Sequence, residues 1–112
     1  MCAERDLKHD PRACDGALAR AFGFLGKRWN GVILAILLGG PAGFAELKRA
    51  VNGISDSVLA DRLSELGQAG LVARTVSDGP PVSVSYCLTP AGQALLPVLN
   101  GLADWAADNL PA

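Results

Sequence analysis

The sequence predicts a mainly α-helical domain that carries one small β-hairpin. Half of the 112 residues are hydrophobic and only 5% are aromatic, so the core is expected to consist mostly of Leu, Val and Ala, which favours helices. Five segments place apolar residues at helical spacing, whereas residues 82–88 alternate apolar and polar side chains as a half-buried strand does. The length suits one compact domain without a deep catalytic cleft.

The N-terminal third is expected to contain an arm and two helices. Residues 1–13 are polar and predict a flexible N-terminal arm ahead of a single domain at residues 14–110. A first helix is expected from about residue 15 to 26, because Leu18, Phe22 and Leu25 recur at helical spacing. The segment KRWNGVILAILL, residues 27–38, predicts a second helix that is buried nearly all round and ends at the Gly-Gly-Pro of residues 39–41.

A third, short helix is expected at residues 43–51. It directs Phe44, Leu47 and Val51 inward, and Lys48 and Arg49 outward. The Asn-Gly pair at residues 52–53 is typical of a tight turn, so the third helix is predicted to end there.

The helix that follows this turn is amphipathic. In ISDSVLADRLSEL, residues 54–66, three leucines form one stripe, while Ser57, Asp61 and Ser64 face the opposite way. Ser55 is well placed as the N-cap of this helix. Gly70 is placed to end it after about residue 69.

The remaining elements are predicted to be a hairpin and a last helix. Strands at residues 71–76 and 82–88 are joined by SDGPP, whose prolines keep the tip of the hairpin out of the ladder. Thr89 and Pro90 are placed as the N-cap and first residue of a helix that reaches about residue 109. Pro97 is expected to bend this helix, because it removes the hydrogen bond to the carbonyl of residue 93.

The charge distribution is more informative than the total. A net charge of −1 and a pI near 5.7 argue mildly against nucleic-acid binding. However, residues 20–75 hold seven Lys and Arg against four Asp and Glu, whereas residues 76–112 hold three acids and no Lys or Arg. A mildly basic middle segment is compatible with one face that binds an anionic ligand.

Several functional classes are disfavoured by the same sequence. The charged N-terminus has no signal-peptide core and the longest apolar run, residues 32–38, is too short to span a bilayer, so a cytoplasmic protein without membrane association is expected. Cys2, Cys14 and Cys87 are then expected to be thiols. Their spacing matches no zinc motif and His9 has no histidine partner, so no metal site or cofactor is expected. No nucleophile has an evident base, so no catalytic residue is predicted.

The order of elements between residues 43 and 88 predicts a winged helix-turn-helix. Two helices at about 43–69, joined by a tight turn, precede a hairpin wing at about 71–88 and a C-terminal helix at about 90–109. The second helix of such a pair presents polar side chains to the major groove, while cations at helix ends and at the wing contact phosphates. The residues predicted to contact double-stranded DNA are Lys27, Arg28, Asn30, Lys48, Arg49, Ser55, Asp56, Ser57, Asp61 and Arg74.

Four of these residues keep a second interpretation. Lys48 and Arg49 fit either phosphate contacts or a solvated helix face. Ser55 is first a helix cap, and a cap can also contact a phosphate. Asp61 either accepts a hydrogen bond from a cytosine amino group or is an exposed helix charge.

Arg62 lies toward the core side of its helix, where an ion pair with Glu65 or Asp61 is an alternative to any DNA contact.

The apolar faces of the first and last helices indicate a possible dimer interface. Trp29 and Trp105 are expected in core or dimer packing. The stripe on the last helix fits either an ordinary core or a dimer seam, and the first helix favours the seam because it already covers the domain. The predicted dimerisation residues are Leu18, Phe22, Leu95, Leu99, Leu102 and Trp105.

The chain resembles the HxlR-type winged helix-turn-helix transcriptional regulators. The resemblance rests on five blocks in family order: LGKRWNGVIL (25–34), GPAGFAEL (40–47), GISDSVLADRLSELGQAGLVART (53–75), PPVSVSYCLTPAGQAL (80–95) and the late Trp105. Each block is weak alone, but together they are specific and cover roughly residues 14–107. The resemblance implies a homodimer whose first and last helices pair, an inverted-repeat operator and no enzymatic activity.

The resemblance also directs attention to Cys14. Family members that sense electrophiles or oxidants carry a cysteine shortly before the first helix, and Cys14 lies in that neighbourhood. Arg12 and a helix N-terminus favour its thiolate, whereas Asp15 opposes it. The family cysteine is usually followed by Pro and lies one or two residues nearer the tryptophan than Cys14 lies to Trp29. A redox or electrophile sensor and an inert thiol therefore both remain, with Cys2 and Cys87 as poorer candidates.

Two functions from different classes follow. The first is a homodimeric, sequence-specific transcriptional regulator that binds double-stranded DNA and responds to a small electrophile or oxidant through Cys14. The alternative is a winged-helix module for protein–protein interaction without DNA binding, for which the acidic pI is the main support.

Overall fold

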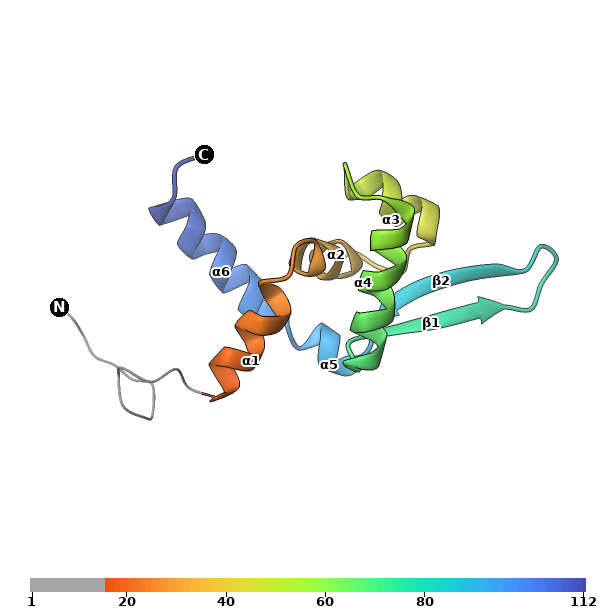
Figure 1. Cartoon of the computed structure of the whole chain (residues 1–112), viewed down its shortest axis with the longest axis horizontal. Helices are drawn as coiled ribbons and strands as arrows, with labels where there is room; N and C mark the ends of the chain where they lie inside the picture. The colour runs from red at the N-terminus through yellow and green to blue at the C-terminus, as the bar shows by residue number, and fades with distance from the viewer. Residues whose placement is uncertain (1–15) are drawn as a thin grey trace.

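A computed structural model describes residues 16–112, so the predicted arm at residues 1–13 and Cys14 lie outside the described residues. Figure 1 shows the arrangement of the elements: a helical centre, a hairpin that extends from one end, and two helices at the other. In chain order they are α1 (Gly16–Leu25), α2 (Asn30–Leu37), α3 (Phe44–Ala50), α4 (Asp56–Gln68), β1 (Val72–Ser77), β2 (Ser83–Leu88), α5 (Pro90–Gln93) and α6 (Leu96–Asn109).

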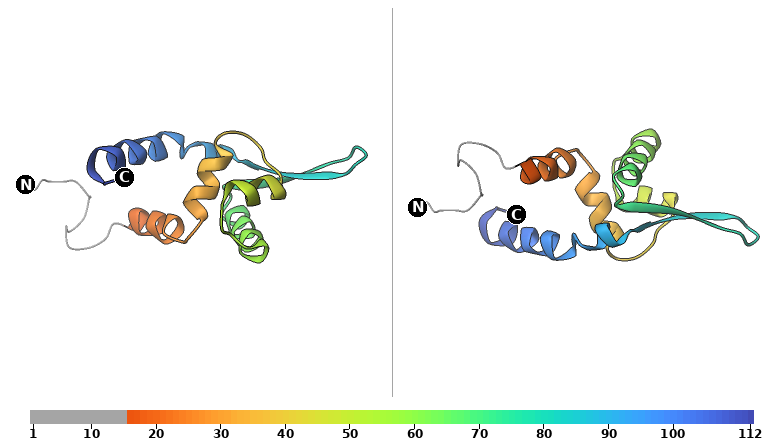
Figure 2. Two further views of the ribbon diagram at one scale, coloured as in Figure 1. Left: turned by 90° about the horizontal axis from the view of Figure 1, so that it is seen from above. Right: turned by 90° about the horizontal axis from the view of Figure 1, so that it is seen from below.

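The core lies between α2, α3, α4 and the base of the hairpin. It is aliphatic, as the low aromatic content predicts, and its buried members are Ile33, Leu34, Leu37, Leu47, Val51, Ile54, Leu59, Leu63, Leu66, Val72 and Leu88. Neither α1 nor α6 contributes a buried residue. Seen from above and below, both helices project away from this core on the side opposite the wing (Figure 2).

The helix-turn-helix forms at the predicted positions. Helix α3 ends before Gly53, whose φ of 95° lies in the left-handed region that favours glycine. The Ser55 hydroxyl oxygen accepts a hydrogen bond from the Val58 N–H at 3.2 Å and caps α4. Gly70, with a φ of 80°, follows the end of α4 as predicted. The residue types at Ser55 and Gly70 thus determine where α4 begins and ends.

The wing is an antiparallel pair in which Val72 faces Leu88 and Arg74 faces Tyr86. The outer edge of β2 is also paired, because Tyr86 and Ala42 exchange two backbone hydrogen bonds of 2.8 and 3.0 Å. This additional bridge was not predicted. Val82, expected to open the second strand, instead lies before β2 and is exposed.

Helix α2 differs from the predicted helix at residues 27–38 in where it starts and in how much of it is buried. It begins at Asn30 rather than at residue 27, because Trp29 adopts a left-handed conformation with a φ of 83° that a helix cannot include. Val32 and Ala35 are exposed, so α2 is buried on one side only and not nearly all round.

The predicted C-terminal helix is two helices. Thr89 caps α5 as expected by accepting from the Gly92 N–H at 3.2 Å, but α5 ends at Gln93 and α6 begins at Leu96. Pro97 explains the break, since it has no N–H for the carbonyl of residue 93 and its ring clashes with that carbonyl. The proline was expected to bend one helix, and instead it lies in the first turn of a separate one.

Candidate nucleic-acid interface

The outward face of α4 is polar, although Val58 in its first turn is an exposed apolar side chain of the same helix. Ser57, Asp61, Ser64 and Gln68 recur at helical spacing and are all exposed, while the leucines of this helix are buried. We call α4 the recognition helix. Ser64 and Gln68 were not among the predicted DNA contacts, although their spacing from Ser57 and Asp61 places them on the same face.

The cations beside the recognition helix fall into two groups. Lys48 of α3 forms an ion pair with Asp56 at 3.0 Å, across the turn between the two helices. Arg49 and Arg74 are exposed and form no ion pair within residues 16–112. Lys48 and Asp56, both predicted to contact DNA, thus partly neutralise one another, and more of the phosphate attraction is left to the arginines.

Two contacts involve the cations at the corner between α1 and α2. The Lys27 ammonium binds the Glu65 carboxylate of the recognition helix at 2.6 Å. The Arg28 guanidinium lies 4.5 Å from the centre of the Trp29 ring, a cation–π arrangement. Trp29 is half-buried against the core, as predicted. Lys27 is therefore paired with Glu65, whereas the Arg28 side chain is exposed to solvent and lies against the Trp29 ring.

Asn30 is the predicted DNA contact that the structure contradicts. It is completely buried at the start of α2. Its Nδ2 donates to the Phe24 carbonyl at 3.0 Å and to Glu65 Oε1 at 3.3 Å, so it joins α1, α2 and α4. Asn30 was predicted as a DNA contact together with Lys27 and Arg28, but these two hydrogen bonds direct its side chain into the protein.

Glu65 is the centre of this polar cluster. Hydrogen bonds from Lys27 and Asn30, and the charges of Arg62 and Lys27, hold the pKa of its carboxyl below the ordinary value. The Arg62 guanidinium lies 3.6 Å from Glu65 Oε1, which confirms the predicted ion pair with this acid. A single carboxylate thus ties the recognition helix to the corner that joins α1 and α2.

The predicted dimerisation residues divide by exposure. Phe22 of α1 and Leu102 and Trp105 of α6 are 63, 54 and 53% exposed, although all three are large and apolar. Leu18, Leu95 and Leu99 are half-buried, and Leu95 packs against the core. Val98 and Leu96 are also exposed and were not predicted. The spacing of Val98, four residues before Leu102, would have identified it.

Within residues 16–112 no three His, Cys, Asp or Glu side chains are grouped to hold a metal ion. No helix in the same range is long and apolar enough to cross a membrane. Cys87 is a half-buried free thiol in β2, and Cys2 and Cys14 lie outside the described residues.

An exposed polar recognition helix between a tight turn and a hairpin wing defines the class of winged helix-turn-helix DNA-binding proteins. The model of the HxlR-like helix-turn-helix family matches residues 24–112, and the chain belongs to this family. Its members are transcriptional regulators and not enzymes, as predicted.

Two relatives illustrate the similarity. The HTH-type transcriptional regulator YodB of Bacillus subtilis is 45% identical over 86 residues, which are 77% of either chain. The reduced form of YodB superimposes with a TM-score of 0.80 at 41% identity, covering 88% of this chain and 95% of that one. A quinone-bound YodB gives 0.75 at 40% identity, covering 86% and 99%. The oxidised redox regulator HypR gives 0.77 at 27% identity, with the same coverage of 86% and 99%.

Proposed function

We propose that this HxlR-family regulator binds an inverted-repeat DNA operator as a homodimer in the cytoplasm, and that residues 14–110 act as one domain. The observation that carries the proposal is the separation of two surfaces. The polar face of α4 belongs to the same part of the chain as the exposed Arg49 of α3 and Arg74 of the wing. The exposed apolar side chains of Phe22, Leu102 and Trp105 belong to α1 and α6, the helices that Figure 1 shows at the end opposite the wing. One surface fits a charged groove, and the other fits a second copy.

Within this proposal, the protein–DNA contacts have distinct roles. Arg28, Arg49 and Arg74 supply phosphate contacts, since none of them forms an ion pair with an acid within the described residues. Ser57 and Asp61 face the base edges, and the Ser55 hydroxyl, which already caps α4, is placed to donate to a phosphate. Lys48 contributes only where its pair with Asp56 opens.

The DNA-binding test uses duplexes selected from random sequence by the wild-type protein. We expect Arg49→Gln and Arg74→Gln each to lower the slope of log affinity against log salt concentration by about 1, because each removes a phosphate contact. Arg20→Gln, the same charge change on α1, is the matched control and should keep the slope. Unchanged slopes for Arg49 and Arg74 would refute the contact assignment. Absence of binding even at low salt would favour a protein-interaction module instead.

The homodimer is tested separately by its geometry. Two recognition helices that enter successive major grooves require half-sites about 34 Å apart, one turn of B-DNA. Inserting about half a helical turn between the selected half-sites should therefore abolish binding by the dimer. Equal affinity for both spacings would refute two-fold recognition.

We further propose that Cys14 makes DNA binding responsive to oxidants or small electrophiles. The support comes from relatives: one solved YodB structure is quinone-bound, and HypR is described as a redox regulator. Treatment with diamide or a quinone should change the DNA affinity of the wild type and of Cys87→Ser, but not of Cys14→Ser. A non-reducing gel distinguishes a disulfide-linked dimer from an adduct on one chain. An equal response in Cys14→Ser would refute the assignment.

A further inference from the structure

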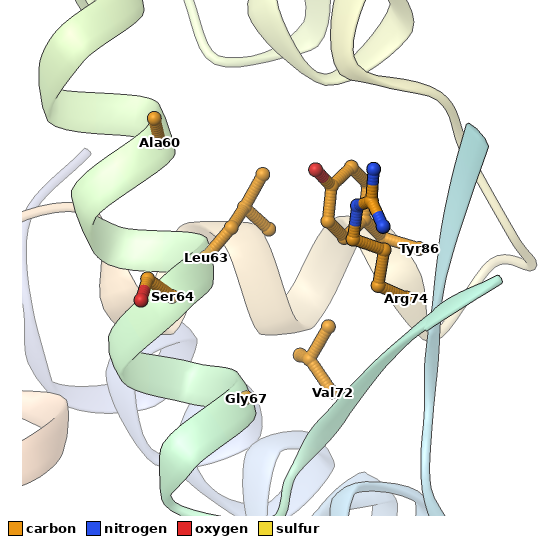
Figure 3. Close-up of a pocket in the computed structure, with 7 residues that line it drawn as sticks. All are labelled: Ala60, Leu63, Ser64, Gly67, Val72, Arg74 and Tyr86. Carbon is orange, nitrogen blue, oxygen red and sulfur yellow. The ribbon is translucent and has the colours of Figure 1, made fainter. Parts of the chain in front are cut away.

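A cavity of about 270 Å³ lies between the recognition helix and the wing. Figure 3 shows Arg74 and Tyr86 projecting from the hairpin into the space that faces α4. The two side chains are brought together by the strand register, which pairs Arg74 of β1 with Tyr86 of β2. The helix side of the cavity includes Leu63 and Gly67, so a cationic group and a phenol face a largely apolar surface.

The polar groups in this cavity have no partners in the part of the chain that the structure describes. The Arg74 guanidinium, the Tyr86 hydroxyl and the Ser64 hydroxyl make no hydrogen bond or ion pair within residues 16–112. The described ion pairs take up Lys27, Lys48 and Arg62 instead. A guanidinium without an acid beside it is a ready partner for a carboxylate or another planar anion.

The other residues that line the cavity favour a ligand with an apolar ring. Leu63 and Val72 line the cavity, and Gly67 leaves an open stretch of helix surface. The volume lies just below the roughly 300 Å³ at which pockets for drug-sized ligands begin, which limits the occupant to about one ring. A DNA phosphate would use Arg74 alone, whereas a small organic ligand would also contact the apolar lining, so the lining favours such a ligand.

We propose that the cavity binds a small aromatic anion of the aryl-carboxylate type, with the carboxylate on Arg74 and the ring between Tyr86 and the recognition helix. Because the site lies between the two elements that contact DNA, a bound ligand and bound DNA would compete for Arg74. This second statement rests on the proposed DNA binding, whereas ligand binding itself does not. Binding of the two partners would then be reciprocally weakened.

The sequence offers a specific reporter, since Tyr86 is the only tyrosine of the chain. The ¹⁹F spectrum of protein labelled with 3-fluorotyrosine therefore contains one protein resonance, which comes from a ring that lines this cavity. Benzoate should shift the resonance saturably with a Kd on the order of 1 mM, as expected for so few atoms. Benzamide, which has the ring but no charge, should bind at least about tenfold more weakly, because it loses the charged hydrogen bonds.

Three variants locate the site. Arg74→Gln should weaken benzoate at least about tenfold. Gly67→Leu should abolish the shift by filling the cavity; it is sterically permitted, since a Cβ there would meet only the Val72 carbonyl oxygen at 3.7 Å. Arg20→Gln is the matched control, because Arg20 lines a different crevice, between α1 and α5. Circular dichroism and melting temperature establish that each variant is folded.

The outcomes separate this inference from the proposed function. No saturable shift with benzoate, an equal Kd for benzamide, or unchanged binding by folded Gly67→Leu would each overturn the inference. Loss of binding in Arg20→Gln but not in Arg74→Gln would assign the ligand to the other crevice and overturn it as well. Saturable binding lost in Arg74→Gln and Gly67→Leu supports the inference even if no duplex is bound. If a duplex is bound, it should raise the Kd for benzoate.

Discussion

The replacement Asn30→Ala tests whether this residue is structural or a DNA contact. The wild-type side chain is completely buried, and its amide donates to the Phe24 carbonyl at 3.0 Å and to Glu65 at 3.3 Å. Alanine removes both donors. Glu65 keeps Lys27 and Arg62 as partners, and the Phe24 carbonyl keeps only a long hydrogen bond of 3.4 Å from the Lys27 N–H. Most of the loss therefore comes from the shorter hydrogen bond to Phe24 and from the space left by the amide.

The expected destabilisation is about 2 kcal/mol, because the amide makes two hydrogen bonds and the loss of each costs about 1 kcal/mol. At roughly 4–8 °C per kcal/mol for a domain of this size, the melting temperature should fall by about 8–16 °C. Thermal and urea unfolding followed by circular dichroism measure the change, at one fixed protomer concentration so that dimerisation does not alter the comparison.

The matched control is Asn100→Ala, which removes an exposed asparagine from α6 and should leave stability within about 0.5 kcal/mol of wild type. Below its melting point, Asn30→Ala should bind selected DNA with wild-type affinity, since the side chain does not reach the surface. A loss no larger than that of the control would refute the structural role. A folded Asn30→Ala with wild-type stability and weakened DNA binding would restore the sequence-based prediction.

Three further predictions concern the cap, the polar cluster and the apolar seam. Ser55→Ala should cost about 1 kcal/mol of stability by removing the α4 cap, whereas Ser55→Asp should keep the cap and weaken DNA binding by charge repulsion; equal DNA affinities would exclude a phosphate near this residue. The pKa of Glu65 is lowered by folding, so its contribution to stability is present above the ordinary carboxyl pKa and is lost as the pH falls through the folded-state value. Glu65→Gln should therefore flatten the acid side of the stability–pH profile, and an unchanged profile would contradict the cluster. Leu102→Glu should produce a folded monomer in sedimentation equilibrium, and an unchanged mass would place the dimer interface elsewhere.

The parts of the fold that were predicted correctly depend on neighbours in sequence. Ser55 caps α4 and Thr89 caps α5 through an N–H three residues later, and Gly70 ends α4 through its own backbone conformation. These interactions are local, so the residue types alone predict them. The recognition helix and the wing were also predicted correctly, because few folds place a helix, a tight turn, a second helix and a hairpin in this order.

The errors depend on contacts between distant residues. Asn30 meets Glu65 across 35 positions, and no periodicity around either residue indicates the pair. Lys48 meets Asp56 only because the turn at Gly53 brings α3 against the start of α4. Residue types predicted that charged side chains surround the helix-turn-helix, but the tertiary structure decides which of them pair internally and which remain for a ligand.

This pairing makes dimerisation central to the proposed DNA affinity. With Lys27 and Lys48 engaged by acids, Arg28, Arg49 and Arg74 are the predicted DNA-contacting cations without an acid partner among residues 16–112. Each phosphate contact adds about 0.9 to the salt dependence, so three contacts give a slope of about −2.7 and two protomers together about −5.4. A monomer would therefore bind weakly at physiological salt. The apolar residues on α1 and α6, although they lie far from the recognition helix, would then determine whether the regulator occupies its operator at all.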